Sequence, residues 1–280
     1  MSRLRVNHEL RLNERMNIRM KIKSLRIKSL IPLCMGLLLV SLSGCGGAPP
    51  QTKEEDSETE QEVAGEAVSL SNESAEDAHI DFETIQAENP DIFAWLYVPG
   101  TDIDYPILQS PVSDDYYKTH TQDGKESQTG ALYTEMPNMM NMCDFNTVIH
   151  GKDEEEGSLF TGLHQFEDVN FFEKHDKFYI YLPDNVLTYE IFVAYYDESS
   201  DILRRYDYTT YEGCASHLNQ IYSLREMGKN QREGWDDLTP YHFLVTLNGS
   251  IREEEAKQYV VIGVLIDDAA GNIDRVILED

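Results

Sequence analysis

Short runs of apolar residues, or of alternating apolar and polar residues, follow one another after residue 79 and predict a mainly β domain. The first two runs, 95–98 and 103–108, flank Pro99-Gly100 and are typical of a β-hairpin. Six further runs predict strands at 131–134, 145–150, 177–182, 186–196, 242–248 and 258–266. Eight strands in one domain favour a closed barrel or a sandwich.

Two segments depart from this strand pattern. A short helix-like run at 82–88 must end at Asn89-Pro90, because the residue before a proline disfavours helical backbone. Apolar residues recur near helical spacing within 208–227, which predicts one long helix between late strands. These residues are Tyr211, Ala215, Leu218, Ile221, Tyr222 and Leu224. After the eighth run, a turn is expected at 270–272 and one more strand at 273–278.

Residues 1–44 have the pattern of a secretion signal. Basic residues precede an apolar stretch, 30–42, which is too short to span a bilayer and typical of a signal-peptide core. The stretch ends at Leu42-Ser43-Gly44-Cys45, which resembles the lipobox of bacterial lipoproteins. That resemblance implies cleavage before Cys45, a diacylglycerol on its thiol, and a lipid anchor at the extracytoplasmic face of the membrane. The alternative is an uncleaved signal anchor, and Met20 is a second candidate for the start.

Composition separates a tether from the folded part. Residues 46–78 contain ten acids, one Lys and no aromatic residue, so 45–78 is expected to be a flexible, lipid-anchored acidic tether, and 79–280 one domain. Residues 1–45 hold nine Lys or Arg and two acids, so the chain's net charge of −28 leaves −35 beyond them. Such an acidic surface repels nucleic acid, which is excluded as a partner.

A series of short motifs runs through residues 80–266. In order, they are Asn89-Pro90-Asp91 with Trp95, Gly100-Thr101-Asp102-Ile103-Asp104-Tyr105-Pro106-Ile107-Leu108-Gln109, Asp115-Tyr116-Tyr117, Gly130-Ala131-Leu132-Tyr133, Asn146-Thr147-Val148-Ile149, Gly157-Ser158-Leu159-Phe160, Thr246-Leu247 and Tyr259-Val260-Val261. Together they resemble the class B sortase family. The resemblance implies a sortase-like mixed eight-stranded β-barrel, with an N-terminal helix and one long helix between late strands.

The resemblance also implies where a catalytic site would lie. Active members of the family cut a sorting signal with a Cys thiolate and pass the acyl group to an amine, with a His acid and an Arg clamp. Ser250 stands in the Cys position, Lys152 in the His position and Gln258 in the Arg position, while His150 replaces a Tyr two residues before Lys152. All three catalytic positions are therefore substituted.

These substitutions weaken each catalytic role. A serine hydroxyl needs an adjacent base to become nucleophilic, and a lysine is a poor base at neutral pH. A glutamine donates hydrogen bonds but brings no charge to an oxyanion. We therefore expect a degenerate sortase domain that has lost cysteine transpeptidation and binds a peptide or a cell-wall component, with the membrane reached through Cys45.

Alternative interpretations remain open at this point. Ser250 activated by a desolvated Lys152 would make a serine-lysine acyl hydrolase or transpeptidase, and His150 is a near miss for the acid, because it shares a strand face with Lys152. An ordinary sortase using Cys143 or Cys214 is a third hypothesis; these two cysteines are expected to be either disulfide-bonded or buried thiols.

No metal or cofactor site is expected from the sequence. The acidic run 153–156 lacks the alternate-position spacing of a calcium loop and is interpreted as a solvated charge cluster. There is no Gly-rich phosphate loop, and Cys and His do not occur at metal-ligand spacing.

The anchor assignment predicts the behaviour of one variant. Replacing Cys45 with Ala should abolish labelling by radioactive or clickable fatty acid and move the protein from the membrane fraction to the medium or wash, because the thiol that receives the lipid is gone. Fractionation of cells that express the two chains checks this. Equal membrane retention of both chains would reject a lipid anchor at this residue.

Overall fold

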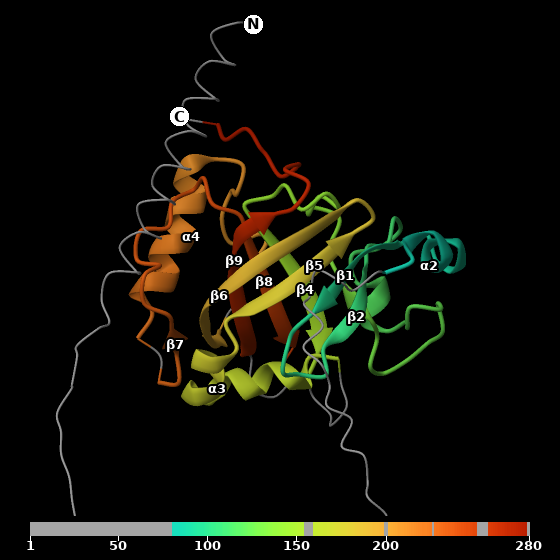
Figure 1. Ribbon diagram of the computed structural model, residues 1–280, viewed down its shortest axis with the longest axis horizontal. Coiled ribbons are helices and arrows are strands. Elements are labelled where there is room, and N and C mark those ends of the chain that lie inside the picture. Colours follow the sequence, from blue (N-terminus) through green and yellow to red (C-terminus); the bar gives the residue numbers. More distant parts are fainter. Residues whose placement is uncertain (1–79, 154–158, 199–200, 226, 251–256, 279–280) are drawn as a thin grey trace, which may run out of the picture. The chain divides into compact units, whose positions relative to one another are not determined.

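Alternating apolar side chains give each strand two different faces, and the strands close into a barrel with one face of each turned inward (Figure 1). The computed structural model describes residues 80–153, 159–198, 201–225, 227–250 and 257–278, with Ser250 described by its backbone alone. The predicted signal segment, Cys45 and the predicted tether lie outside the described residues.

The barrel is built from eight strands. In space they follow the order β5-β1-β2-β3-β4-β8-β9-β6, and β6 pairs again with β5, which closes the ring. Two neighbouring pairs, β2 with β3 and β4 with β8, are parallel, and the others are antiparallel, so the sheet is mixed. The bounds are β1 Ile92–Tyr97, β2 Asp104–Leu108, β3 Leu132–Tyr133, β4 Asn146–Lys152, β5 Lys177–Leu182, β6 Asn185–Asp197, β8 Leu244–Ser250 and β9 Gln258–Asp268. The predicted eight-stranded mixed barrel is confirmed.

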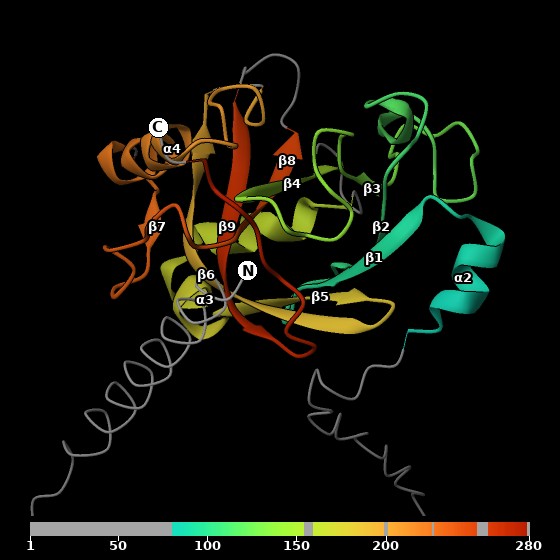
Figure 2. The ribbon, with the colours of Figure 1, turned by 90° about the horizontal axis from the view of Figure 1, so that it is seen from above.

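Helices lie outside the barrel. The described α-helices are α2 Phe82–Glu88, α3 Val169–Lys174 and α4 Tyr211–Ser223, and the 3-10 helices are η2 Tyr116–Lys118 and η3 Thr161–Glu167. The helix α2 ends at Asn89, as the following proline predicts. Figure 2 shows α2 beside β1 on one side of the barrel and α4 beside β6 and β9 on the other. No helix within the described ranges is long and apolar enough to cross a bilayer.

Two hydrophobic clusters hold these layers together. The first fills the barrel and includes Leu96, Val245 and Val261. The second packs between the outer face of the sheet and α4, where Leu218 and Ile221 of the helix meet strand residues of β6, β8 and β9. Thr210 caps α4, because its side chain accepts a hydrogen bond from the Gly213 backbone N–H at 3.1 Å. The predicted long helix is confirmed, although Tyr211 points to solvent rather than to the sheet.

The additional strand predicted at 273–278 is wrong. The described residues there have irregular backbone, with one isolated bridge between Thr210 and Leu278. Both edges of β9 are already paired, with β6 and with β8, so β9 offers this segment no free edge. No residue of the segment is fully buried and Val276 is 89% exposed, so burial adds little to hold it as a strand. The predicted turn is present, and Gly271 has a φ of 70° in the left-handed region.

The sequence patterns also missed β7, Asn230–Gln231, which pairs with Val193 and Ala194 of β6. Two residues are too few to show an alternation of apolar and polar side chains, and both are polar. The short α3 was missed for a similar reason, since six residues span less than two helical turns.

Packing of α4 on the sheet should be a major part of the domain's stability. Ile221 is fully buried in the cluster between α4 and the sheet, so Ile221→Ala is expected to lower the free energy of unfolding by about 2–5 kcal/mol. Asn219 on the same helix is exposed, so Asn219→Ala should change it by less than about 0.5 kcal/mol. Urea unfolding of the two variants measures both values, and equal effects would contradict this packing.

Candidate functional site

Three neighbouring strands bring the substituted positions together. In the parallel pair of β4 and β8, Lys152 is the register partner of Ser250, and in the antiparallel pair of β8 and β9, Ser250 is the partner of Gln258. Cross-strand partners occupy the same face of a sheet, so the three positions form one row across the strands. We call this the Lys152–Ser250–Gln258 row. Residues separated by about 100 positions in the chain therefore meet at the place that the motifs predict.

The chemistry of the row follows from the two side chains that the structure describes. The Lys152 ammonium donates to the backbone carbonyl of Gln128. The Gln258 side chain is partly exposed, yet its Oε1 is buried and has no hydrogen-bond partner among the described atoms. An ammonium already bound to a carbonyl and an uncharged amide flank the central position. The row thus presents neither an imidazole nor a guanidinium.

A second row lies one pleat further along the same face. His150 is the register partner of Asn248, and it shares a face with Lys152 because the two are separated by two residues on β4. Asn248 Nδ2 lies 3.2 Å from His150 Nδ1, and the His150 ring stacks on Tyr133 with 5.1 Å between ring centroids. The predicted common face of His150 and Lys152 is therefore present.

His150 is neutral near neutral pH. Burial lowers its pKa to about 4. Because Asn248 donates to Nδ1, we assign the ring proton to Nε2, which lies 3.4 Å from Glu135 Oε1. The ring is thus fixed in place by the hydrogen bond to Asn248 and by its stacking on Tyr133.

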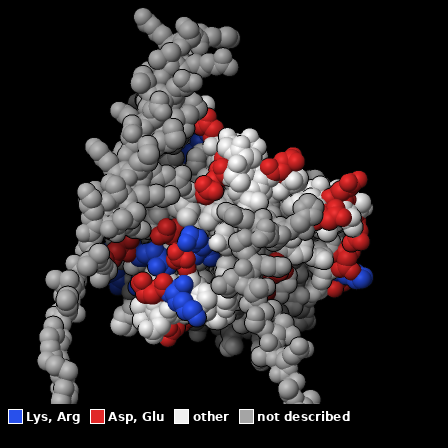
Figure 3. Space-filling model, in the orientation of Figure 1, with Lys and Arg blue, Asp and Glu red and all other residues white. Residues whose placement is uncertain are grey.

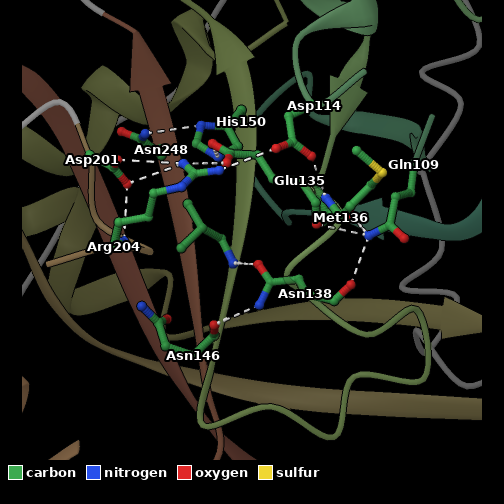
Figure 4. Close-up of polar contacts among 12 residues, drawn as sticks. Gln109, Asp114, Glu135, Met136, Asn138, Asn146, His150, Asp201, Arg204 and Asn248 are labelled. Carbon is green, nitrogen blue, oxygen red and sulfur yellow. Dashed lines mark hydrogen bonds and ion pairs between the residues drawn. The ribbon is translucent and has the colours of Figure 1, made fainter. Parts of the chain in front are cut away.

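An arginine beside His150 links two loops of the barrel, the one after β2 and the one after β3 (Figure 4). Arg204, which follows β6, places Nη1 2.8 Å from Glu135 Oε2 and Nη2 3.2 Å from Asp114 Oδ2. Asp201 accepts from the Arg204 backbone N–H at 3.0 Å and lies 3.4 Å from its guanidinium. Burial raises the pKa of Glu135, and the guanidinium opposes that shift. Three carboxylates thus surround one cation directly beside His150.

Sequence patterns did not identify Glu135, Arg204 or Asn248. Each belongs to a different segment, and charged residues in connections are usually solvated. Only the register of β4 with β8, and the path of the chain after β6, bring them to His150. The available indication was the position of Asn248 two residues before Ser250, on the same strand face.

A polar pair lies behind the row, on the inner side of the sheet. Asp153 follows β4, is 8% exposed, and accepts from His164 Nε2 at 3.1 Å. This hydrogen bond raises the pKa of His164, and Glu167 acts in the same direction. The interpretation of Asp153 as part of a solvated cluster is therefore wrong, because the residue points inward and has a charged partner; 154–156 lie outside the described residues.

The two cysteines of the domain lie away from the row. Both are buried free thiols, so they form no disulfide. Cys214 is on α4, where its Sγ lies 3.2 Å from the Tyr208 carbonyl oxygen and burial raises its pKa, so it stays protonated. Cys143 precedes the opposite end of β4. Neither thiol can act at the Lys152–Ser250–Gln258 row. The described residues hold no group of three His, Cys, Asp or Glu side chains arranged for a metal.

Known proteins with similar sequence and structure define the class. No protein-family model matches the chain. The chain is 29% identical over 189 residues to sortase B of Listeria monocytogenes, which covers 65% of this chain and 74% of that protein. A mutant form of Clostridium perfringens sortase B superimposes with a TM-score of 0.59 and 26% identity, over 66% of this chain and 86% of the other.

A third similarity involves a Streptococcus pyogenes class B sortase involved in pilus biogenesis. Its structure has a TM-score of 0.57 and 26% identity, over 67% of this chain and 98% of that one. The closed mixed barrel and the order of its strands define a sortase fold. In fold and in sequence, the chain is therefore similar to class B sortases.

The buried neutral His150 predicts a pH dependence of stability. Its folded pKa of about 4 lies below the ordinary value near 6.5, so its contribution is complete above about pH 6.5 and is lost as pH falls toward 4. The loss should reach roughly 3 kcal/mol. In His150→Asn, the free energy of unfolding should therefore depend less steeply on pH between 6.5 and 4.

Urea unfolding at pH 7, 6, 5 and 4 measures this slope. The variant keeps some pH dependence, because burial also lowers the pKa of His217, to about 3. An identical slope in the natural chain and in His150→Asn would show that His150 is not buried neutral in the fold.

Proposed function

We propose that this protein is a cell-surface lipoprotein whose sortase-like domain has lost cysteine transpeptidation and binds a peptide or a cell-wall component at the Lys152–Ser250–Gln258 row. The observation that supports the loss of chemistry is the register itself. It aligns the three substituted positions with one another, which supports the motif placement that puts Ser250, Lys152 and Gln258 where Cys, His and Arg would act.

The substitutions act on different steps of acyl transfer. Without a base, a serine at the central position is a weak nucleophile compared with a partly ionised cysteine. The Lys152 Nζ donates to the Gln128 carbonyl, so it is engaged away from the hydroxyl whose proton a base would have to take. A glutamine supplies no positive charge where an oxyanion would develop. Each loss alone costs rate, and together they affect attack, proton transfer and charge stabilisation.

The same strand face still offers groups for binding. Gln258 has a buried Oε1 without a partner among the described atoms, and this oxygen can accept a hydrogen bond from a backbone N–H. Asn248 and His150, which are hydrogen-bonded to each other, place further polar groups beside the row. Such a combination of amide groups suits an extended peptide or an amide-rich cell-wall fragment.

Charge limits the class of partner. The face in Figure 3 has Asp and Glu side chains spread over the described surface, with Lys and Arg gathered mainly in one region. A net charge of −35 beyond residue 45 disfavours nucleic acid and anionic lipid as partners of the folded part. Contact with the membrane would then run through the lipid on Cys45 rather than through the domain.

One alternative has a specific observation in its favour. Lys152 and Ser250 are register partners, which is the proximity that a serine-lysine acyl hydrolase or transpeptidase requires. The contact of Lys152 with Gln128 counts against it, because Nζ is held at a backbone carbonyl in an exposed setting, whereas a lysine base requires a desolvated one. We therefore prefer the binding function and use Ser250→Ala to separate the two.

A set of variants tests the loss of chemistry. The full chain, Ser250→Ala and the triple variant Ser250→Cys, Lys152→His, Gln258→Arg are compared for cleavage of sorting-signal peptides and for adducts with acyl-trapping reagents. The natural chain should show neither. The triple variant should cleave, with a gain of about 10²–10⁴-fold over the natural chain, because a positioned acid-base group contributes that range.

Each outcome has a distinct meaning. Turnover by the natural chain that vanishes in Ser250→Ala would establish the serine-lysine alternative and overturn the proposal. Cleavage by the triple variant alone would show that peptide still binds at this face. Ser250→Cys without the other two changes is the matched control, since it restores the nucleophile but neither the acid nor the clamp.

A further inference from the structure

A methionine-rich turn stands apart from the Lys152–Ser250–Gln258 row. Four of the nine methionines lie within 136–142, and Cys143 follows them directly. We call residues 136–143 the Met–Cys turn. Met139 is 47% and Met140 51% exposed, although methionine is usually among the most buried residues. Soft sulfur side chains thus gather at the surface where apolar packing does not require them.

The backbone of this turn is held firmly. The Met142 N–H donates to the Met139 carbonyl at 3.1 Å, which closes a tight turn. Asp144 accepts from the Met139 N–H at 2.6 Å and from the Asn138 side chain at 3.1 Å. Asn138 is itself buried and accepts from the Val148 N–H at 2.9 Å. The turn is therefore anchored to the start of β4.

Met142 differs from the other methionines of the turn in both backbone conformation and burial. Its φ of 60° is the one positive value at a non-glycine residue in the described ranges. Met142 is 1% exposed and belongs to the core of the barrel. Met139 and Met140, which precede it, remain on the outside. The turn thus buries one methionine and leaves three exposed, Met136, Met139 and Met140.

Met140 and Cys143 open into one cavity. Its volume is about 590 Å³, and its lining also includes Asn141 and apolar residues such as Phe93 and Ile273. Cys143 is 7% exposed, and its thiol lies 3.5 Å from the Asn141 carbonyl oxygen. Met140 and Cys143, three residues apart, therefore line one cavity, together with apolar residues and with polar ones such as Asp184 and Asn272.

We propose that the Met–Cys turn binds a soft monovalent cation, Cu(I), through Cys143 and Met140, which line the cavity, with Met139, the preceding residue outside that lining, as a further exposed sulfur donor. Thiolate and thioether ligands select Cu(I), whereas hard cations require oxygen ligands. The Cys143 S–H bond breaks on binding, its proton leaves to solvent, and a sulfur–copper bond forms. Copper is supplied in the reduced state, so no electron transfer is involved. The site is independent of the function proposed for the row.

Competition with a Cu(I)-specific chromophoric chelator, under anaerobic conditions and with the full chain, tests this site. Cys143→Ser should lower the number of tightly bound Cu(I) ions by one and remove the corresponding thiolate-to-copper absorption. The double variant Met139→Leu, Met140→Leu should weaken that ion's affinity at least about tenfold. Leucine is close to methionine in volume, so packing is little disturbed.

Two controls keep the result specific to the turn. Met227→Leu removes a methionine that is 97% exposed elsewhere, and Cys214→Ser removes the other thiol of the domain; neither should change the affinity of the ion lost in Cys143→Ser. Ag(I), an air-stable probe of the same softness, should raise the melting temperature of the natural chain more than that of the double variant.

The proposal is overturned if the double variant binds Cu(I) as tightly as the natural chain. It is also overturned if Met227→Leu weakens binding by the same factor, because copper would then be held by exposed methionines in general. Circular dichroism of each variant, together with its melting temperature without metal, distinguishes a lost ligand from a lost fold.

Discussion

The pairing of β4 with β8, and of β8 with β9, is the constraint on which the candidate site depends. A slip of one residue in either pair would send alternate side chains to the opposite face and break up the Lys152–Ser250–Gln258 row. Gly151 and Gly249, which are register partners of each other, oppose such a slip. A Cβ on Gly151 would lie 2.5 Å from a Leu132 side-chain carbon, and one on Gly249 would lie 2.5 Å from Asp153 Oδ2. A side chain at either position would have to displace a neighbouring side chain, so the two glycines favour the observed register.

The site was largely predictable because the strands that carry it are recognised from local features of the sequence. Several features can be predicted from short stretches of sequence. They are the alternation of the strands, the proline that ends α2 and the helical spacing of apolar residues in α4. The motifs placed Lys152, Ser250 and Gln258 at strand ends, and the register brought these ends together. What could not be predicted depends on distant partners. The network of Glu135 with Arg204 joins two connections that no periodicity relates.

The errors have the same origin. The pattern at 273–278 resembles a strand, but a strand also needs a free edge, and β6 and β8 occupy both edges of β9. Asp153 belongs to an acidic run that looks solvated, but the inward turn of its side chain depends on His164 from η3. In both cases the local pattern is real, but a residue or strand distant in sequence determines the structure that forms.

The separation of core and site explains how this fold can persist while its chemistry changes. The inward residues Val245, Leu247 and Val261 of β8 and β9 pack in the barrel, whereas the row lies on the opposite face at the strand ends. Replacing outward side chains removes little buried apolar area, so it costs little stability. The polar contacts that remain are the hydrogen bond between Asn248 and His150 and the approach of His150 to Glu135, and both form without a catalytic partner. A sortase-like barrel is therefore free to lose its nucleophile, acid and clamp without losing its structure, and its function must be sought in what this face binds.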